Sequence, residues 1–346
     1  MRVLMVGPDV EKVPGGMATV VKNYMDSQLA NKFKIRYISS NIEGNIINKL
    51  LFNIKALFKY LINIKKYDIV HIQMAERGSF YRKSIYIIIA KLLGKKIIVH
   101  FHGAEFDEFY HKESNKLQKM YIRYILGKSN LIIALGDNWK KKIKRYTNTE
   151  IVVLNNAVEV PDNNFYDINN KNILLLGRLE QRKGTFDLLD ITDNVLQEDS
   201  RFNLVLAGDG NLEVVKKKID KLQLKDNVKL LGWINKEQRE EIFKNTAIFV
   251  LPSYNEGMPM AILEAMSYGI PLVVSDVGDI PYLVNDEENG YLINAGDKKQ
   301  LEDRVLRLMK DKDLRAKISR NNYDKVKNKF NLQLNLKKME KIYMGL

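Results

Sequence analysis

Cysteine is absent from this chain of 346 residues, and histidine occurs only four times, at His71, His100, His102 and His111. The lack of cysteine excludes a disulfide scaffold, a thiol nucleophile and any zinc site built on thiolates. So few histidines also argue against a histidine-rich metal centre. We therefore expect no metal ion and no cofactor that cysteine or histidine would hold.

Long hydrophobic runs are also missing. The first seven residues are too short for the apolar core of a signal peptide and lead into polar residues. The densest apolar run, residues 85–90, is far shorter than a membrane span. We expect a cytoplasmic protein, either free or peripheral on the inner face of the cytoplasmic membrane.

Positive charge is plentiful and unevenly distributed. The net charge is +14, with 45% hydrophobic and 28% charged residues. Residues 1–168 hold 27 Lys and Arg against 15 Asp and Glu, whereas residues 169–346 hold 29 against 27. The basic half points to an anionic partner, either nucleic acid or a membrane surface. An AT-rich genome would explain the lysine content equally well, but it would not explain the asymmetry.

Short apolar runs alternate with amphipathic stretches, which predicts an α/β fold with parallel sheets. In the first half the expected strands are 3–6, 35–38, 69–72, 97–101, 131–135 and 151–154, and the expected helices are 17–30, 46–65, 83–94, 113–127 and 137–146. In the second half the expected strands are 173–176, 204–207, 228–231, 248–251 and 272–275, and the expected helices are 184–198, 211–223, 236–244, 259–268 and 297–310.

The alternation is interrupted at 159–171, a polar, Asn-rich stretch that contains Pro161 and reads as a linker. The length fits two domains. We expect two doubly wound domains, at 1–165 and 166–330, facing each other across a cleft. The last helix, about 331–346, has no strand after it and is expected to pack back on the first domain.

Ligands of open α/β sheets lie beyond the carboxyl ends of the strands, so we expect site residues in the loops there. After the first strand, Gly15 and Gly16 enter a helix, where backbone N–H groups can approach an anion; a plain tight turn is the alternative. His102 follows another strand and can hydrogen-bond a substrate hydroxyl; a structural histidine is the alternative. His100, inside that strand, is interpreted as packing.

The first strand of the second half is followed by a basic loop. Arg178 and Lys183 flank this loop, which ends at a helix N-terminus. A guanidinium fork, a point charge and a helix dipole together suit a diphosphate. A solvated basic turn is the alternative.

Two glutamates occur close together in the stretch 251–290. Glu256 lies in a loop shaped by Gly257 and Pro259, and Glu264 lies on an apolar helix. A carboxylate among apolar residues is costly unless it accepts hydrogen bonds, for which ribose hydroxyls would be suitable donors. A capping or ion-paired glutamate is the alternative.

Together these elements resemble the retaining GT-B glycosyltransferases of the family-4 type, over most of the chain and most strongly from about 172 to 296. Glu256 and Glu264 are separated by seven residues, as in the E-x7-E motif of that family. The other matching elements are Gly15-Gly16, His102-Gly103, 155–158, Gly177-Arg178-Leu179, Lys183-Gly184, 207–210, 231–233, Pro252-Ser253, 275–278, Ile280-Pro281 and 289–292.

The resemblance implies a role for each matching position. Arg178 and Lys183 would bind the donor diphosphate, with the Gly16 amide reaching it across the cleft. Glu264 would bind the donor ribose, and Glu256 would bind hydroxyls of the donor sugar with the amides of Gly257 and Met258. His102 would contact the donor sugar and the acceptor, and Gly232 and Trp233 would lie near the nucleobase.

The resemblance further implies transfer of a sugar from a nucleotide-diphosphate sugar, most simply a UDP-sugar, to a glycan or lipid-linked acceptor with retention of configuration. The pathway would be capsule, exopolysaccharide or lipopolysaccharide biosynthesis. No metal or cofactor is expected, and neither glutamate is assigned as a nucleophile. The chain departs from the family at Asp279 and Tyr282, which replace the usual Gly and Glu of a Gly-Gly-Ile-Pro-Glu loop.

The family's first domain receives the acceptor, and here it carries a basic amphipathic stretch. No acidic residue occurs between Glu43 and Asp68. Among its Leu, Ile and Phe residues lie five lysines: Lys49, Lys55, Lys59, Lys65 and Lys66. Such a helix can lie on an anionic bilayer. The alternative is that its apolar side belongs to the core.

Two other functions remain as alternatives. Nucleotide-sugar 2-epimerases share the two-domain fold, although the E-x7-E set with Arg178 and Lys183 favours a transferase. A nucleic-acid-binding protein would explain the charge, but no nucleic-acid-binding motif is recognisable, and we expect no such partner.

Overall fold

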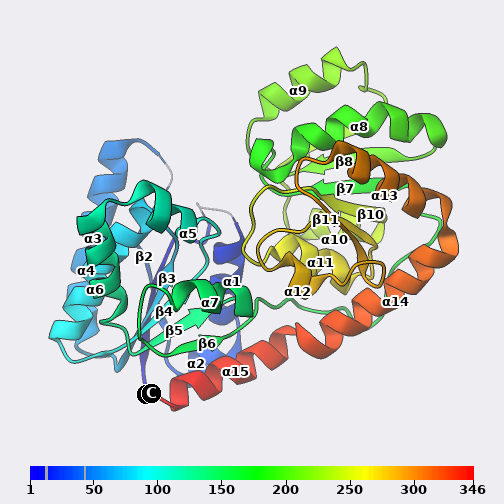
Figure 1. Cartoon of the computed structure of the whole chain (residues 1–346). Coiled ribbons are helices and arrows are strands. Elements are labelled where there is room, and N and C mark those ends of the chain that lie inside the picture. Colours follow the sequence, from blue (N-terminus) through cyan, green and yellow to red (C-terminus); the bar gives the residue numbers. More distant parts are fainter. Residues whose placement is uncertain (12–14, 43) are drawn as a thin grey trace. The chain divides into compact units, whose positions relative to one another are not determined.

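The computed structural model describes residues 1–11, 15–42 and 44–346, and the chain forms two compact units (Figure 1). The first unit comprises Met1–Ala157 with Leu332–Leu346, and the second comprises Val158–Asn331. The division therefore falls at Ala157, a little before the expected boundary at 165. Helix α15 (Leu332–Met344) is part of the first unit.

The stretch 159–171, which the sequence suggested was a linker, is tied to the second unit by its polar groups. The Tyr166 hydroxyl donates to the carbonyl of Ala247 at 3.0 Å. The Asn164 amide donates to the Ser319 hydroxyl at 2.9 Å. The polar side chains of this stretch therefore form hydrogen bonds with other residues of the second unit.

The first unit is built on a six-stranded parallel sheet, ordered β2-β1-β3-β4-β5-β6. Its strands are β1 (Val3–Gly7), β2 (Arg36–Ser39), β3 (Ile69–Met74), β4 (Lys96–Phe101), β5 (Leu131–Ala134) and β6 (Ile151–Val153). Its helices are α1 (Gly16–Met25), α2 (Gln28–Lys32), α3 (Ile46–Ile64), α4 (Gly78–Leu92), α5 (Phe106–Glu108), the π-helical turn η1 (Phe109–Glu113), α6 (Lys116–Leu126), α7 (Asp137–Ile143) and α15. The strand order reverses between β1 and β3, which makes that edge the expected ligand site.

The second unit has its own six-stranded parallel sheet, ordered β12-β11-β10-β7-β8-β9. Its strands are β7 (Asn172–Leu176), β8 (Asn203–Ala207), β9 (Val228–Gly232), β10 (Thr246–Leu251), β11 (Leu272–Ser275) and β12 (Gly290–Ile293). Its helices are the 3₁₀ turn η2 (Gln181–Lys183), α8 (Thr185–Glu198), α9 (Leu212–Lys221), α10 (Lys236–Lys244), α11 (Met260–Ser267), α12 (Ile280–Leu283), α13 (Lys298–Lys310) and α14 (Lys312–Lys329). Here the order reverses between β7 and β10.

Each sheet is covered by helices on both faces (Figure 1), which explains why its strands are apolar throughout. In the first unit all residues of β3 are buried, and in the second all residues of β10 are buried. Phe80 and Ile87 of α4 belong to the first core, and Leu188 and Val195 of α8 belong to the second.

Several element boundaries differ from those expected. The predicted helix 17–30 is divided into α1 and α2, and the predicted helix 83–94 begins earlier, at Gly78. Strand β12 and helix α14 were not predicted. No helix within the described ranges combines the length and the apolar character that a membrane crossing requires.

Candidate functional site

Two loops meet at the carboxyl edge of the second sheet, where the strand order reverses. One follows β7 and ends at Gly184, and the other follows β10 and begins at Pro252. Gly184 has a φ of +71°, and a Cβ at this position would lie 2.1 Å from the Pro252 carbonyl oxygen. The loops therefore touch through backbone, and only glycine permits that approach.

The loop contact brings Lys183 and Glu256 together. The Lys183 Nζ lies 2.5 Å from Glu256 Oε1, and the Ser253 hydroxyl donates to the same oxygen at 2.8 Å. The Lys183 side chain is 15% exposed and that of Glu256 is 7% exposed. Sequence reasoning singled out both charged residues and listed Ser253 among the matching positions, but it gave Ser253 no role.

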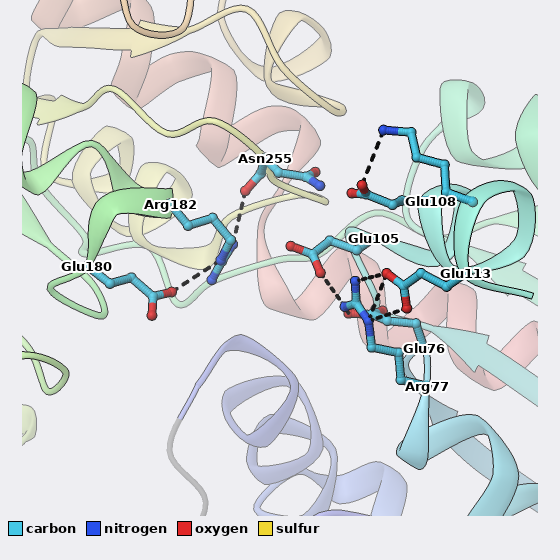
Figure 2. Close-up of polar contacts among 9 residues, drawn as sticks. Glu76, Arg77, Glu105, Glu108, Glu113, Glu180, Arg182 and Asn255 are labelled. Atoms are coloured by element: carbon cyan, nitrogen blue, oxygen red, sulfur yellow. Dashed lines mark hydrogen bonds and ion pairs between the residues drawn. The ribbon is translucent and has the colours of Figure 1, made fainter.

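Arg182 forms a second set of contacts between the two loops, and sequence reasoning gave it no role. Its Nε lies 3.2 Å from Glu180 Oε1, and its NH1 donates to the Asn255 carbonyl at 3.0 Å (Figure 2). The Tyr254 amide donates to the Arg182 carbonyl at 2.8 Å. Arg182 therefore fixes the backbone on either side of the Lys183–Glu256 pair.

Arg178 differs from these two cations because it is largely open to solvent. Its side chain is 55% exposed, and its Nε lies 3.4 Å from Glu180 Oε2. The N-terminus of α8 follows Lys183 and Gly184 directly. An exposed guanidinium, a buried ammonium and a helix N-terminus are thus gathered at one sheet edge, an arrangement that suits a bound anion.

Glu264 lies on α11 and is mostly buried, with a side chain that is 16% exposed. Its Oε1 lies 3.0 Å from NH1 of Arg239 on α10. Burial raises the pKa of this carboxyl, and the Arg239 charge opposes the rise. Glu264 is therefore ion-paired, as one of the two interpretations of the sequence had it, and Arg239 contacts only one of its two oxygens.

The neighbouring loops complete this edge of the second sheet. Gly278 has a φ of +61°, and a Cβ there would lie 1.9 Å from the Glu256 carbonyl oxygen. The amide of the buried Asp279 donates to the Gly257 carbonyl at 3.0 Å, beside the buried Met258. Asp279, the first of the two positions that depart from the family pattern, therefore lies next to the loop that carries Glu256. The second, Tyr282, is 45% exposed and packs edge-on against Phe330.

Gly232 and Trp233 lie farther along the same edge, where β9 ends. The Gly232 carbonyl accepts a hydrogen bond from the Gly208 amide at 2.7 Å. Trp233 is 61% exposed, unlike the other tryptophan, Trp139, which is buried. An exposed indole at a strand's carboxyl end offers a flat surface on which a base can stack.

In the first unit, the expected glycine pair begins α1. Gly16 is the first helical residue, and Gly15 precedes it with a φ of +143°. The Gly15 carbonyl accepts the Thr19 amide, so the first turn closes there. The Gly16 amide lies at the start of the helix, where backbone N–H groups have no partner within the helix. The preceding residues 12–14 lie outside the described ranges.

His102 follows β4 directly, and its amide donates to the Met74 carbonyl at 2.8 Å. Its side chain is half-buried, and its Nε2 lies 2.7 Å from Gln73 Oε1. Burial lowers the pKa of His102 well below its usual value, as do the nearby His100 and Lys83. The ring is therefore neutral at neutral pH. His100 is buried within β4, as expected.

Sequence reasoning missed Arg77, which follows β3 at the edge where this sheet reverses. Arg77 has a φ of +54°, a strained conformation for a residue with a side chain. Its guanidinium pairs with Glu105 and with Glu113, whose Oε2 lies 2.9 Å from the Arg77 Nε (Figure 2). Its position after a predicted strand was available from the sequence, but its strained backbone and its two glutamate partners depend on the folded structure.

The basic helix α3 exposes most of its apolar residues. Its buried residues are Ala56, Tyr60, Asn63 and Ile64. Eight large hydrophobic side chains are exposed, by 43–84%: Ile46, Ile47, Leu50, Leu51, Ile54, Phe58, Leu61 and Ile62. Lys55, Lys59, Lys65 and Lys66 are exposed as well, and Lys49 is half-buried. The core interpretation therefore fits only one narrow side of this helix. We call the eight exposed apolar residues and the five lysines the α3 surface.

No group of three or more His, Asp or Glu residues among those described is arranged to hold a metal ion. The polar groups at the edge of the second sheet are instead cations, carboxylates and backbone amides, which suit an anionic substrate that carries hydroxyl groups.

Comparison with known proteins assigns the family. Residues 162–325 match the model described as glycosyl transferases group 1, and residues 14–160 match glycosyltransferase family 4. The chain is 30% identical to UDP-Gal:α-D-GlcNAc-diphosphoundecaprenol α-1,3-galactosyltransferase of Escherichia coli, covering 90% of this chain and 86% of that protein. It is 25% identical to the capsular polysaccharide biosynthesis glycosyltransferase CapM of Staphylococcus aureus, covering 67% of each.

Among solved structures, the chain resembles Anabaena HepE in complex with UDP, with a TM-score of 0.77 at 16% identity and full coverage of both chains. That likeness concerns the fold, which is the GT-B fold. None of these matches supports the epimerase alternative. The chain belongs to the group 1 glycosyltransferases and is a glycosyltransferase with two Rossmann-like domains.

Proposed function

We propose that the protein transfers a sugar from a nucleotide-diphosphate sugar, with UDP as the nucleotide, and that the loops after β7 and β10 bind the donor. The observation that carries the proposal is the pairing of Lys183 with Glu256 across two loops that Arg182 also joins by a hydrogen bond. The UDP bound to HepE and the UDP-Gal in the name of the E. coli relative support the choice of nucleotide.

Arg178 and Lys183 would stabilise the departing diphosphate. Breaking a glycosyl–phosphate bond leaves negative charge on the phosphate, and cations fixed in advance at that place lower the barrier most effectively. An ammonium has three N–H donors, so Lys183 can keep its contact with Glu256 while it binds phosphate oxygens. Arg178, which is exposed, offers its guanidinium without first losing a buried partner.

The other groups would orient the rest of the donor. Glu256 would accept hydrogen bonds from sugar hydroxyls, beside the backbone amides of Gly257 and Met258. Glu264 would hold the ribose with the oxygen that Arg239 leaves open. Trp233, at the end of β9 with Gly232, would stack on the base.

The first unit would contribute Gly15, Gly16 and His102. The Gly16 amide would bind a donor phosphate oxygen at the start of α1. His102 would hydrogen-bond a hydroxyl of the donor sugar or the acceptor. Because His102 is neutral, its contribution would not change between pH 6.5 and 9.

We further propose retention of configuration and independence from metal ions. Same-face attack, with the leaving phosphate taking the acceptor's proton, needs no carboxylate nucleophile. Lys183 and Arg178 would supply the positive charge that a divalent ion supplies elsewhere. Product analysis by NMR should show the donor's anomeric configuration preserved, and EDTA should leave the rate unchanged. Inversion, or loss of activity that Mg²⁺ or Mn²⁺ restores, would contradict these two points.

The acceptor is proposed to be a lipid-linked glycan in surface-polysaccharide synthesis, reached while the α3 surface lies on an anionic membrane. The lipid-linked acceptor of the E. coli relative and the capsular pathway of the S. aureus relative support this. So does the α3 surface itself, because water-exposed Ile, Leu and Phe residues beside lysines have the composition of an interfacial helix.

The donor is the first thing to establish. A panel of UDP-, GDP-, ADP- and dTDP-sugars should be tested for thermal stabilisation of the protein and for slow hydrolysis. UDP-sugars should stabilise it, and one of them should be turned over. If no nucleotide sugar raises the melting temperature or is hydrolysed, the donor site is wrongly assigned. Conversion of a donor to its epimer without acceptor would favour the isomerase instead.

A further inference from the structure

A chain of buried polar groups leads from the C-terminal helix to His102. The Tyr343 hydroxyl of α15 lies 2.7 Å from Nδ1 of His71 on β3. Nε2 of His71 lies 3.2 Å from the amide nitrogen of Gln73. The Gln73 oxygen lies 2.7 Å from Nε2 of His102. Four side chains from three elements of one unit thus form a single hydrogen-bonded series.

The amide of Gln73 gives this series a direction. With the Gln73 amide in this orientation its nitrogen donates to His71 Nε2, and the His71 proton then resides on Nδ1. His71 then donates to the Tyr343 hydroxyl oxygen. An amide oxygen only accepts, so His102 must carry its proton on Nε2. The nitrogen that His102 has left, Nδ1, is an unprotonated acceptor.

The surroundings keep this series neutral and dry. Tyr343, His71 and Gln73 are fully buried. Burial lowers the pKa of His71 well below its usual value. The charged or titratable groups that act on His102 are His100, Lys83 and His71, and each disfavours a second proton on the ring. The His100 ring lies tilted against that of His102 with centroids 4.3 Å apart, and it is stacked on His71 at 5.6 Å.

We propose that Gln73, His71 and Tyr343 are positioning residues that hold His102 in its Nε2–H tautomer, so that Nδ1 accepts a hydrogen bond from a substrate hydroxyl. The value of this tautomer for catalysis rests on the proposed function, in which His102 contacts a sugar. The tautomer itself does not rest on the proposed function, because it follows from the hydrogen bonds of Gln73 and His71. Since Nε2 is committed to Gln73, only Nδ1 is left to meet the substrate.

The same arrangement makes α15 part of the site's support. Asn335 on α15 accepts a hydrogen bond from Tyr24 at 3.3 Å and donates to the Asn155 carbonyl at 2.6 Å. Those contacts seat the helix, and Tyr343 lies two turns beyond them. The C-terminal helix thus contributes a hydroxyl to the tautomer of a residue that lies at the end of a central strand.

Removal of the Tyr343 hydroxyl should reverse the donor-to-acceptor direction of the hydrogen bonds in this series. In Tyr343→Phe the Nδ1–H of His71 would lose its acceptor, and a buried N–H without a partner is less tolerable than a buried lone pair. His71 should then move its proton to Nε2 and donate to the Gln73 oxygen. The Gln73 amide would turn over and donate to His102 Nε2. His102 would be left with its proton on Nδ1.

The test is ¹⁵N NMR of the full-length protein labelled at histidine, with the His102 signals assigned by their loss in His102→Gln. Wild-type protein should show His102 protonated on Nε2, and Tyr343→Phe should shift it toward Nδ1–H. The matched control is Tyr60→Phe, which removes another buried hydroxyl of the same unit, one that donates to the Tyr86 carbonyl. The control should leave His102 unchanged.

Kinetics supply the second readout. Tyr343→Phe should lower kcat about 5- to 10-fold, the usual effect of one hydrogen bond, with nucleotide affinity unchanged by calorimetry. A wild-type His102 protonated on Nδ1, or a Tyr343→Phe variant with unchanged tautomer, would overturn the proposal. Failure of the proposed function looks different: His102→Gln would then transfer sugar as fast as wild type, while the tautomer result would stand.

Discussion

Single residues show most clearly where the sequence was informative and where it was not. Lys183 and Glu256 could be selected because a charged residue at a strand's carboxyl end is a recognisable pattern. Arg182 could not, because it acts through a loop that is distant in sequence. Ser253 contacts Glu256 only three residues away, but nothing in the spacing shows that its hydroxyl would share an oxygen with Lys183. Glu264 was placed correctly on its helix, but its Arg239 partner lies on a different helix and carries no sequence signal.

The buried His100, near the end of β4, makes the fold sensitive to acid. The pKa of His100 is lowered by burial to about 3, and neither of its ring nitrogens has a hydrogen-bond partner among the described residues. The unfolded chain binds a proton at His100 below about pH 6.5, whereas the folded chain does not. The stability that depends on a neutral His100 is therefore complete above pH 6.5 and is lost as the pH falls toward 3.

Replacement of His100 by Phe should remove that sensitivity while it keeps an aromatic ring in the packing. We expect His100→Phe to be more stable than wild type by about 1 kcal/mol at pH 7.5, because a polar group without a partner is removed. The difference should grow by about 1.4 kcal/mol for each pH unit below 6.5. Urea unfolding at pH 7.5 and pH 5.5 measures it. A difference that stays constant would show that His100 titrates normally in the folded state.

At the scale of elements, helix α14 explains most of what sequence reading missed. Three of its six buried residues, Arg315, Ser319 and Asn322, are polar or charged, so its packing side gives only a weak apolar periodicity. The Arg315 guanidinium donates to the carbonyls of Met309 and Ile168 at 2.8 and 3.0 Å, and Asn322 donates to the Ile270 carbonyl at 2.8 Å. A helix that packs through hydrogen bonds cannot be recognised from hydrophobic spacing.

The strands were predictable because two-sided burial makes each a continuous apolar run. Strand β12 was missed because it begins with a glycine, a residue that is rare in strands, and is held in the sheet by pairing with β11. Helix α3 was predicted, but the sequence could not decide which of its apolar residues face the core. Its neighbours decide that, and most of its Ile and Leu residues remain exposed.

The close approach of the loops after β7 and β10 can be tested by adding one methyl group. In Gly184→Ala the new Cβ would overlap the Pro252 carbonyl, besides occupying a φ of +71°. The loops should separate, and UDP affinity should fall roughly 10-fold or more, because misplaced donor groups lose their alignment. Calorimetric titration with UDP measures this.

Gly94→Ala is the matched control for that substitution. Gly94 has a similar φ of +65°, but no atom lies within 4 Å of the added Cβ. This variant should lose about 1 kcal/mol of stability from backbone strain and keep its UDP affinity. Equal UDP binding by Gly184→Ala and wild type would contradict the view that the loop contact shapes the donor site.

At the scale of the whole molecule, charge and apolar exposure combine in the first unit. The excess of positive charge lies in the first half of the sequence, and the α3 surface belongs to that half. Lysine side chains near an anionic bilayer contribute about 1 kcal/mol each, and inserted apolar side chains add to this. The proposed interfacial role would account for both the charge asymmetry and the exposed apolar residues.

Membrane binding should depend on the α3 surface and not on net charge alone. Replacement of Lys55, Lys59 and Lys65 by Glu should release the protein from vesicles that contain phosphatidylglycerol, as should replacement of Ile47, Leu50 and Phe58 by Ser. Co-sedimentation measures both. Lys216 and Lys217, exposed on α9 of the second unit, provide the control when changed to Glu. If both α3 variants sediment like wild type, the α3 surface does not bind membranes.

The proposed donor site depends most on Lys183, which the two loops hold beside Glu256 and which would stabilise the diphosphate that leaves during sugar transfer. The most direct measurement is the rate of transfer from a UDP-sugar by Lys183→Ala, compared with Lys218→Ala, which removes another lysine of the second unit paired to a carboxylate at 2.5 Å. We predict a loss on the order of 100-fold or more for Lys183→Ala and near-normal transfer for Lys218→Ala, with both variants folded. Transfer by Lys183→Ala at the wild-type rate would show that Lys183 does not stabilise the leaving diphosphate.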